Sequence, residues 1–483
     1  MSTVPSRAHG LGYNQDSMIL EKIYVQCLSL GSYFLADRDS KEAAVIDPQR
    51  DTGAYESLLQ EGGYRLKYVL ETHLHADFVS GHVDLAAKTG ALIVFGKEAR
   101  AAMPHLAVSE GEVLRLGANI EIKVMETPGH TPESVCYLAR DLSEPGKPMK
   151  LFTGDTLFDG DVGRPDLLGA KLPASFLASR LYDSLRKKIM PLPDGTEVYP
   201  AHGAGSACGR NLGDSEFTTI GAQKRDNYAL QPMDADAFIA LVTEDQPEAP
   251  AYFGEDARLN REGPALLDAV LGKLAPLVPR DLAAAMGQGT VLLDTRGAEA
   301  YARGAIPGSI AIGLDGQFAS WVGALIPHGT RLAILADPDR HAEAALRCAR
   351  IGYDNVAGYL VGGLEAWISA GLPSETYMRS DAEGLLRAVQ DPGGVAVLDV
   401  RRAGERAAAY VPGSLAIPLN QLLRRMAEVP KDKPILIHCA GGYRSSMAVS
   451  VFRRAGYMGV TDVADGLRSY AKRKFPLLTS SKP

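Results

Sequence analysis

Histidine and aspartate side chains gather in one short stretch near the N-terminus. Residues 71–78 read ETHLHADF and follow an apolar run that predicts a buried strand. Imidazole and carboxylate groups crowded at the end of a strand are the donors that a metal ion needs. Three later glycine-bearing loops each add one candidate ligand, namely His130, Asp155 and His202. Together the four segments predict a metal site.

A reactive thiol is predicted near the C-terminus. Residues 433–446 read KPILIHCAGGYRSS, so an apolar strand delivers Cys439 to a glycine-rich turn, and a helix begins at the serines. Backbone N–H groups of such a turn converge on the sulfur, and the helix N-terminus adds positive potential. Arg444 can place a further charge on the same anion. This pattern is typical of a nucleophilic thiolate.

An internal repeat supplies the elements that position Cys439. The segment VLLDTRGAEAYARGAIPGSIAIGL, from Val291, reappears about one domain length later as AVLDVRRAGERAAAYVPGSLAIPLN, from Ala396. In each copy a strand ends in Asp-x-Arg, and a helical stretch leads to a Pro-Gly turn and a second strand. This alternation predicts a small α/β domain with a parallel sheet. At the place of Cys439 the first copy has Asp337 and lacks the glycine-rich turn, so we expect it to be inactive.

The chain of 483 residues is too long for a single core. A polar segment rich in proline and glycine separates the histidine-rich part from the two repeats. We expect a metal-binding domain at 18–245, a linker at 246–275, an inactive repeat at 276–376 and an active repeat at 377–483.

Composition excludes several classes of function. The apolar fraction of 46% and the charged fraction of 23% are those of a soluble globular protein. A formal net charge of −7 and the lack of a long Lys/Arg run argue against a nucleic-acid binder. The sequence has no apolar run that suits a signal peptide or a membrane span, and its five scattered cysteines do not form a disulfide framework. We expect a cytoplasmic protein that binds neither nucleic acid nor a membrane.

The histidine- and aspartate-bearing segments resemble the motifs of the metallo-β-lactamase superfamily in their order and in their residue pattern. The resemblance covers about residues 18–230. The resemblance implies an αββα sandwich. Two-metal hydrolases of that superfamily carry H-x-H-x-D-H, but Phe78 stands at the last position here and has no lone pair to donate. A zinc thioester hydrolase of the glyoxalase II type is therefore a disfavoured alternative, although His202 stands where a ligand of a second metal would sit.

The mononuclear branch that the sequence resembles is the persulfide dioxygenases. That resemblance implies one Fe(II) per chain, held by His73, His130 and Asp155 as the two-histidine, one-carboxylate triad of non-haem iron oxygenases. Positions left open on the iron would take substrate sulfur and O₂. Three further residues would orient a ligand or shape the cavity, namely His75, Asp77 and His202.

Other residues of this domain are candidates for handling the substrate. Residues 160–166 read GDVGRPD and resemble a stretch that follows the aspartate ligand in this family, so Arg164 and Asp166 could hold a carboxylate or phosphate of the carrier thiol. Arg225 matches a later family arginine more loosely, and capping of local structure is an equal interpretation. Cys208 could relay sulfane sulfur, or it could be a small buried side chain.

The second repeat resembles the rhodanese active-site loop and its surroundings over about residues 380–478. Four residues separate Cys439 from Arg444, one fewer than in the phosphate-sized loop of the related dual-specificity phosphatases. The resemblance implies that Cys439 becomes a persulfide and passes its outer sulfur to an acceptor. The first repeat then resembles an inactive rhodanese domain with a structural, spacing or docking role.

Over nearly its full length the chain resembles the bacterial CstB-type fusions of a persulfide dioxygenase with two rhodanese domains. The resemblance implies that a low-molecular-weight thiol persulfide, of the glutathione or coenzyme A type, reacts with O₂ to give sulfite and thiol, while Cys439 forms or uses thiosulfate. We expect a homo-oligomer, a dimer or tetramer, in sulfide detoxification. A non-catalytic sulfide or redox sensor is a further alternative, although no helix-turn-helix segment supports it.

Overall fold

The computed structural model describes residues 16–167, 172–206, 208–209, 212–213, 215–244, 246, 248–391 and 393–479. The chain divides into an N-terminal unit, Met1–Ala249 with Asp256–Pro264, and a C-terminal unit, Pro250–Glu255 with Ala265–Pro483. The expected domain limits at residues 245 and 483 lie outside the described residues. Among the described helices, none combines the length and the apolar character that a membrane crossing requires.

The described strands of the N-terminal unit form two six-stranded sheets. The first sheet contains β1 (Met18–Val25), β2 (Leu30–Asp37), β3 (Glu42–Ile46), β4 (Arg65–Leu70), β5 (Leu92–Gly96) and β6 (Leu106–Val108). The second contains β7 (Val113–Leu116), β8 (Ile120–Glu126), β9 (Val135–Asp141), β10 (Lys150–Gly154), β11 (Glu197–Pro200) and β12 (Thr218–Thr219). In β2, Tyr33 and Leu35 join the core between the sheets, while Phe34 and Ala36 join the core under the outer helices. This period of two lets the sheet pack on both faces.

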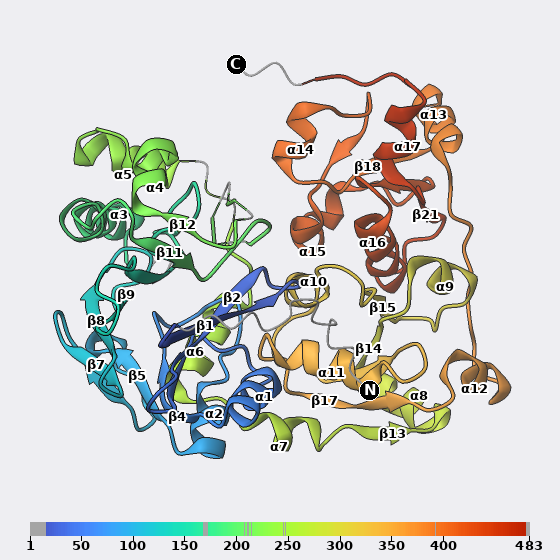
Figure 1. Ribbon diagram of the computed structural model, residues 1–483. Coiled ribbons are helices and arrows are strands. Elements are labelled where there is room, and N and C mark those ends of the chain that lie inside the picture. Colours follow the sequence, from blue (N-terminus) through green and yellow to red (C-terminus); the bar gives the residue numbers. More distant parts are fainter. Residues whose placement is uncertain are drawn as a thin grey trace. The chain divides into compact units, whose positions relative to one another are not determined.

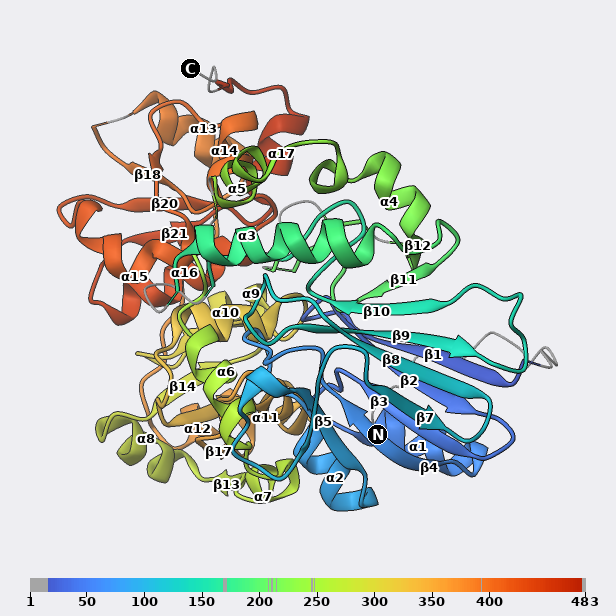
Figure 2. The same cartoon turned by 90° about the vertical axis from the view of Figure 1, so that its left-hand side faces the viewer.

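Helices cover the outer face of each sheet. The helices are α1 (Gly53–Gly62), α2 (His82–Thr89), α3 (Ala174–Ser184), α4 (Ile220–Asp226) and α5 (Ala235–Thr243), with short η1 (Lys97–Ala99), η3 (Leu185–Ile189) and η4 (Tyr228–Leu230). Tyr55 and Leu85, from α1 and α2, pack on the first sheet, whereas Leu181 and Phe238, from α3 and α5, pack on the second. Figure 2 shows α3 and α1 on opposite sides of the paired sheets. The expected αββα sandwich is confirmed.

The described strands of the C-terminal unit form two small parallel sheets. The first has the strand order β13-β17-β16-β14-β15 and the second β19-β18-β20-β21. Their strands are β13 (Ala275–Leu277), β14 (Val291–Asp294), β15 (Ile310–Ala311), β16 (Leu332–Leu335), β17 (Val356–Leu360), β18 (Ala396–Asp399), β19 (Leu415–Ala416), β20 (Ile435–His438) and β21 (Val460–Asp462). The prediction of two parallel-sheet α/β domains is confirmed.

Helices connect the strands of both sheets. In the first repeat they are α7 (Leu267–Leu271), α8 (Pro279–Gly287), α9 (Ala298–Arg303), α10 (Phe318–Leu325), α11 (His341–Ala349) and α12 (Gly363–Ser369). In the second they are α13 (Ala382–Gln390), α14 (Ala403–Ala408), η5 (Leu419–Gln421), α15 (Leu422–Arg425), η6 (Met426–Glu428), α16 (Tyr443–Arg454) and α17 (Gly466–Lys472). Helix α16 packs against β15 of the first repeat, as Figure 1 shows.

The Asp-x-Arg motif has the same structural role in both repeats. Arg296 Nη2 donates to Asp294 Oδ2 at 2.6 Å in the first repeat, and Arg401 Nη2 donates to Asp399 Oδ2 at 2.7 Å in the second. Each aspartate is the last residue of a buried central strand. The paired arginine neutralises the buried carboxylate and fixes the chain as it leaves the sheet.

The segment expected to be a linker is largely folded. Helix α6 (Phe253–Glu262) begins in the C-terminal unit and ends in the N-terminal one, and α7 follows it. Two polar residues of α6, Asp256 and Asn260, are buried. Because part of the buried face of this helix is polar, hydrophobic periodicity does not reveal it in the sequence.

Candidate metal centre and thiol site

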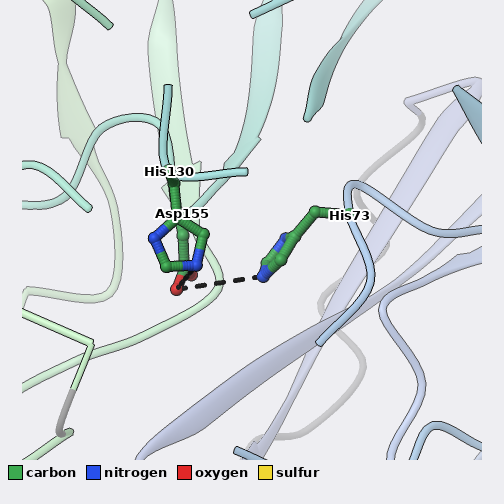
Figure 3. Close-up of side chains that lie close together, drawn as sticks. All are labelled: His73, His130 and Asp155. Atoms are coloured by element: carbon green, nitrogen blue, oxygen red, sulfur yellow. Dashed lines mark ion pairs between the residues drawn. The ribbon is translucent and has the colours of Figure 1, made fainter. Parts of the chain in front are cut away.

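Three of the predicted metal ligands meet in a buried cluster. His73 follows β4, His130 lies between β8 and β9, and Asp155 follows β10. Asp155 Oδ2 lies 3.4 Å from His130 Nε2 and 3.9 Å from His73 Nε2, and Figure 3 shows the three side chains directed at one another. Donors about 2.1 Å from one tetrahedral ion stand about 3.4 Å apart. The cluster therefore has about the size of a metal site.

Hydrogen bonds fix which nitrogen these two histidines offer. His130 Nδ1 lies 2.9 Å from the carbonyl oxygen of Arg164, which can only accept, so Nδ1 carries the proton. Thr72 Oγ1 donates to Asp47 Oδ2 at 2.8 Å and therefore accepts from His73 Nδ1 at 2.9 Å. Both rings thus direct Nε2 at the cluster, and Nε2 is the nitrogen that would bind a metal ion there.

The electrostatics of the cluster fit a divalent cation. Both carboxylate oxygens of Asp155 are buried, and neither has a hydrogen-bond partner among the described residues. Burial, and then the neighbouring His75 and His130, lower the pKa of His73 well below its usual value, so the ring is neutral. A buried carboxylate is costly unless a cation compensates its charge. The donor set therefore suits a metal ion such as iron or zinc.

His75 points away from this cluster, although it stands only two residues after His73. Its Nε2 lies 3.1 Å from Asp47 Oδ1 and 3.4 Å from Glu71 Oε2. Burial alone would lower the pKa of His75, but Asp47 and Glu71 raise it to about 9, so the ring is protonated at neutral pH. The Phe78 ring packs against it, with 4.4 Å between the ring centroids. The two histidines of the H-x-H motif thus belong to two different clusters.

Asp77, His202 and Cys208 form a second buried group beside the first. Their donor atoms all lie within 4.8 Å of one another. His202 Nε2 lies 3.4 Å from Asp77 Oδ2 and 3.6 Å from Asp155 Oδ1. Its Nδ1 donates to the carbonyl oxygen of Ser29 at 3.2 Å. The two groups therefore meet at Asp155.

A residue that sequence reasoning does not single out holds the loop after β4. Asn260 donates through Nδ2 to the carbonyl oxygens of His75 and Phe78, both at 2.8 Å. Its Oδ1 accepts from the backbone N–H of Ser80 at 2.8 Å. Asn260 is 1% exposed, so water cannot replace these bonds. The sequence around Asn260 is polar and typical of a linker, so no pattern in it indicates that Asn260 holds the loop after β4.

The predicted substrate arginines have protein partners. Arg164 is buried and donates to both carboxylate oxygens of Asp166, at 3.0 and 2.7 Å. Arg225 is exposed and donates to the carbonyl oxygen of Gly221, one turn earlier in α4, at 3.0 Å. The geometry of Arg225 matches the interpretation that it caps local structure. A role of either arginine in binding substrate stays a prediction.

The turn between β20 and α16 encloses the sulfur of Cys439. The residue is 1% exposed, the backbone N–H of Gly442 donates to Sγ at 3.1 Å, and Ser445 Oγ lies 3.5 Å from Sγ. Gly442 has a φ of 88°, and a Cβ at this position would meet the carbonyl oxygen of Ala464 at 1.7 Å. Only glycine fits here, and its N–H supports negative charge on the sulfur.

Arg444 is held by a carboxylate of the same domain. Its Nη1 and Nη2 donate to the two carboxylate oxygens of Glu405, at 2.6 and 2.7 Å. This bidentate pair fixes the guanidinium beside the turn. The action of Arg444 on a sulfur anion stays a prediction.

Arg379, in the connection between the two repeats, supports the turn from the other side. Its Nε and Nη2 donate to Asp462 at 3.0 and 2.7 Å, and Nη2 also donates to the carbonyl oxygen of Gly442 at 3.3 Å. Asp462 accepts in turn from Ser445 Oγ at 3.1 Å. Through Nη1, Arg379 donates to Glu299 of the first repeat at 2.6 Å. The first repeat is thereby linked to the turn around Cys439 in the second.

Helix α16 contacts the first repeat directly. Tyr443 Oη donates to the carbonyl oxygen of Gly313 at 2.8 Å, and Ser450 Oγ accepts from the N–H of Ala311 at 3.0 Å. Tyr443 lies four residues after Cys439 in the same turn. The first repeat therefore forms part of the support of the thiol site.

Comparison with known proteins identifies the families of both parts. The profile of the metallo-beta-lactamase superfamily matches residues 29–202, and that of the rhodanese-like domain matches residues 278–370 and 381–473. The chain belongs to the metallo-β-lactamase superfamily, and it carries two rhodanese-like domains.

The relatives of the metal-binding part include two kinds of enzyme. The mitochondrial persulfide dioxygenase ETHE1 of Mus musculus is 33% identical over 208 residues, which cover 42% of this chain and 77% of that protein. The hydroxyacylglutathione hydrolase of Polaromonas sp. is 31% identical over 188 residues, which cover 38% of this chain and 66% of that protein.

A solved structure resembles a larger part of the chain. The crystal structure of a metallo-beta-lactamase from Staphylococcus aureus subsp. aureus COL matches with a TM-score of 0.63 and 33% identity. The match covers 71% of this chain and 99% of that chain. The likeness therefore extends well beyond the metal-binding region.

Proposed function

We propose that the metal-binding domain is a non-haem iron persulfide dioxygenase and that the second rhodanese-like domain transfers sulfur through Cys439. The observation that carries the first half is the three-donor cluster of His73, His130 and Asp155, from which His75 is turned away. Two imidazoles and one carboxylate leave positions for a sulfur ligand and O₂. Iron, when bound there, supplies the redox chemistry that couples reduction of O₂ to oxidation of sulfur. The similarity to ETHE1 supports this assignment.

The proposed substrate is a low-molecular-weight thiol persulfide of the glutathione or coenzyme A type. The reaction converts R–S–SH, O₂ and H₂O into R–SH and H₂SO₃, so the outer sulfur is oxidised and O₂ is reduced. The carboxylate of Asp77 and the Nε2 of His202 lie beside the cluster and can accept the proton of the incoming persulfide. The buried surroundings of the site keep competing water away from the reactive sulfur.

At the second site, Cys439–SH and thiosulfate give Cys439–S–SH and sulfite, or the reverse reaction forms thiosulfate. The N–H of Gly442 is placed to stabilise the sulfur that carries the charge. Sulfite is the product of the first site and a reactant of the second, which is the chemical reason for joining the two. In this proposal Cys208 is a predicted sulfur relay, and Arg164 and Asp166 are predicted to bind the carrier.

The test is O₂ uptake by protein that has been loaded anaerobically with Fe(II), with glutathione persulfide or coenzyme A persulfide as substrate. We expect consumption of O₂ with formation of sulfite by the iron form and none by the zinc form. Equal activity with zinc, or no O₂ consumption by fully iron-loaded protein, would overturn the proposal.

A zinc thioester hydrolase is the second candidate. It is supported by the hydroxyacylglutathione hydrolase relatives and by the additional donors Asp77, His202 and Cys208. Hydrolysis of S-lactoylglutathione without O₂ distinguishes it from the oxygenase. Turnover of this thioester by the zinc form, with no O₂ uptake by the iron form, would favour the hydrolase.

A further inference from the structure

The beginning of helix α17 is fixed against the turn that holds Cys439. The backbone N–H of Leu467 donates to the carbonyl oxygen of Cys439 at 2.7 Å, and that of Arg468 donates to the carbonyl oxygen of Ala440 at 3.1 Å. Gly466 has a φ of 57°, and a Cβ at this position would lie 2.5 Å from the carbonyl oxygen of Cys439. Only glycine allows the two segments to approach this closely.

The close approach places the guanidinium of Arg468 beside Gly441, which stands two residues after Cys439 in the turn. The three atoms nearest to a Cβ built at Gly441 are Nη1, Cζ and Nε of Arg468, at 3.5, 3.6 and 3.7 Å. Gly441 is not among the glycines with a positive φ, so its backbone conformation does not require glycine. Glycine at this position instead leaves no side chain between the guanidinium and the turn.

Arg468 differs from the two arginines already described at this turn, because no carboxylate compensates its charge. Arg444 forms a bidentate pair with Glu405. Arg379 forms a second bidentate pair, with Asp462. Arg468 is exposed and has no ion-pair partner among the residues that the structure describes. An arginine that lacks a carboxylate partner attracts an incoming anion more strongly than one whose charge is already compensated.

We infer that Arg468 is the specificity-determining residue of the thiol site and binds the sulfur–oxygen group of an anionic substrate, thiosulfate or sulfite. The inference rests on the proposed sulfur transfer at Cys439 and adds the residue that selects the substrate. A planar guanidinium offers parallel N–H donors that match two oxygens of such a group. The position of Arg468 beside Gly441 places these donors next to the turn in which the sulfur reacts.

The charge that Arg468 binds is present before and after the transfer. The thiolate of Cys439 attacks the outer sulfur of thiosulfate, a sulfur–sulfur bond to Cys439 forms, and the bond between the two sulfurs of thiosulfate breaks. The electron pair of that bond leaves with sulfite, so the total charge is conserved. Because Arg468 contacts the oxygens of both thiosulfate and sulfite, it lowers KM for thiosulfate more than it raises kcat.

The inference is tested by alkylation of Cys439 in the full-length protein with two reagents of similar size, anionic iodoacetate and neutral iodoacetamide. Mass spectrometry follows the modification at Cys439, because the chain has five cysteines. The ratio of the iodoacetate rate to the iodoacetamide rate cancels changes in the reactivity of the thiolate itself. Arg468→Ala should lower this ratio about fivefold, the effect of one charge close to the reagent in water, and Arg468→Lys should keep most of it.

Lys472→Ala is the matched control. Lys472 is also an exposed cation of α17, but it lies one turn further from Gly466 than Arg468 does. We expect the alkylation ratio of this variant to equal that of the wild type. In turnover with thiosulfate, Arg468→Ala should raise KM about tenfold and change kcat little.

An unchanged alkylation ratio in Arg468→Ala, or an equal fall of the ratio in Lys472→Ala, would overturn the inference. So would an unchanged KM for thiosulfate in a variant that still transfers sulfur. Arg468→Gln removes the same charge and keeps most of the side chain, so it decides the question if Arg468→Ala does not fold. The alkylation ratio involves no turnover, so failure of the proposed sulfur transfer and failure of the role of Arg468 remain distinguishable.

Discussion

At the residue scale, the two histidines of the H-x-H motif belong to two different clusters, which the spacing of the residues does not reveal. His73 joins His130 and Asp155, whereas His75 faces Asp47. The difference arises from hydrogen bonds made by Thr72 and Asp47, which come from the ends of different strands. Contacts of this kind join residues that are distant in the sequence, so a local pattern does not show which histidine joins the cluster; the expectation for His73 came from the family resemblance.

The first prediction concerns a ligand of the proposed iron. His130→Ala removes one of three donors, and we expect the iron content of anaerobically loaded protein and its O₂ uptake to fall by about tenfold or more. Metal analysis and an oxygen electrode measure the two quantities. The control is His105→Ala, because His105 lies outside the donor clusters. Full iron occupancy in His130→Ala would contradict its role as a ligand.

The second prediction concerns the pH dependence of stability. Burial, against the opposing charge of Asp399, lowers the pKa of His438 to about 4 from its usual value of 6.5. Between these pH values the unfolded chain binds more protons than the folded one, so His438 makes stability fall as pH decreases from about 6.5 to about 4. His438→Leu should weaken this dependence in calorimetric unfolding between pH 7 and pH 5. An unchanged pH dependence of stability in His438→Leu would show that His438 does not couple proton binding to folding.

At the element scale, the sequence predicted the strands that carry the candidate site residues. It did not predict that helix α6 holds the loop after β4. The turn after β20 was predictable because glycine and serine follow an apolar run, and these residues have specific backbone roles. Helix α6 was not predictable, because it buries Asp256 and Asn260 where a helix usually buries apolar side chains. The two repeats were predictable because one strand in each repeat, β14 or β18, leads into the same Asp-x-Arg pair.

The third prediction tests the support that α6 gives to the metal loop. Asn260→Ala leaves the carbonyl oxygens of His75 and Phe78 without their donor, which costs about 1 to 3 kcal/mol for each buried group. We expect a lower unfolding temperature and faster loss of iron to a chelator. Arg258→Ala, which breaks an exposed ion pair on the same helix, is the control and should change little. Equal behaviour of the two variants would rule out the supporting role of Asn260.

The fourth prediction tests Arg379 as a positioning residue. Arg379→Met removes the bonds to Asp462 and Gly442 that hold the turn. Because the N–H of Gly442 then loses its fixed direction towards the sulfur, we expect kcat for sulfur transfer from thiosulfate to fall about tenfold or more, with a shift in the pH profile of Cys439 alkylation. Arg379→Lys should restore part of the activity. A purely structural role would lower stability without moving that pH profile.

At the scale of the whole molecule, the two proposed reactions are assigned to different compact units of the chain. The candidate metal donors belong to the N-terminal unit, and Cys439 belongs to the C-terminal one. The proposed chemistry links them through sulfite, which diffuses, so no shared residue is required. The two activities should therefore be separable by mutation.

The fifth prediction follows from this separation. Cys439→Ser should abolish sulfur transfer from thiosulfate and leave most of the O₂ uptake with a thiol persulfide, because Cys439 is not among the metal donors. The two activities are measured on the same preparation of full-length protein. Loss of both together would contradict independent sites.

We propose that one iron in the His73, His130 and Asp155 cluster carries the oxidation of a persulfide. The most direct measurement is the O₂ consumed and the sulfite formed by full-length protein of graded iron content, with glutathione persulfide or coenzyme A persulfide in excess. We predict a rate that rises in proportion to iron up to one iron per chain, and one O₂ consumed for each sulfite formed. A rate that is independent of iron, or sulfite formed without O₂ consumption, would contradict the account.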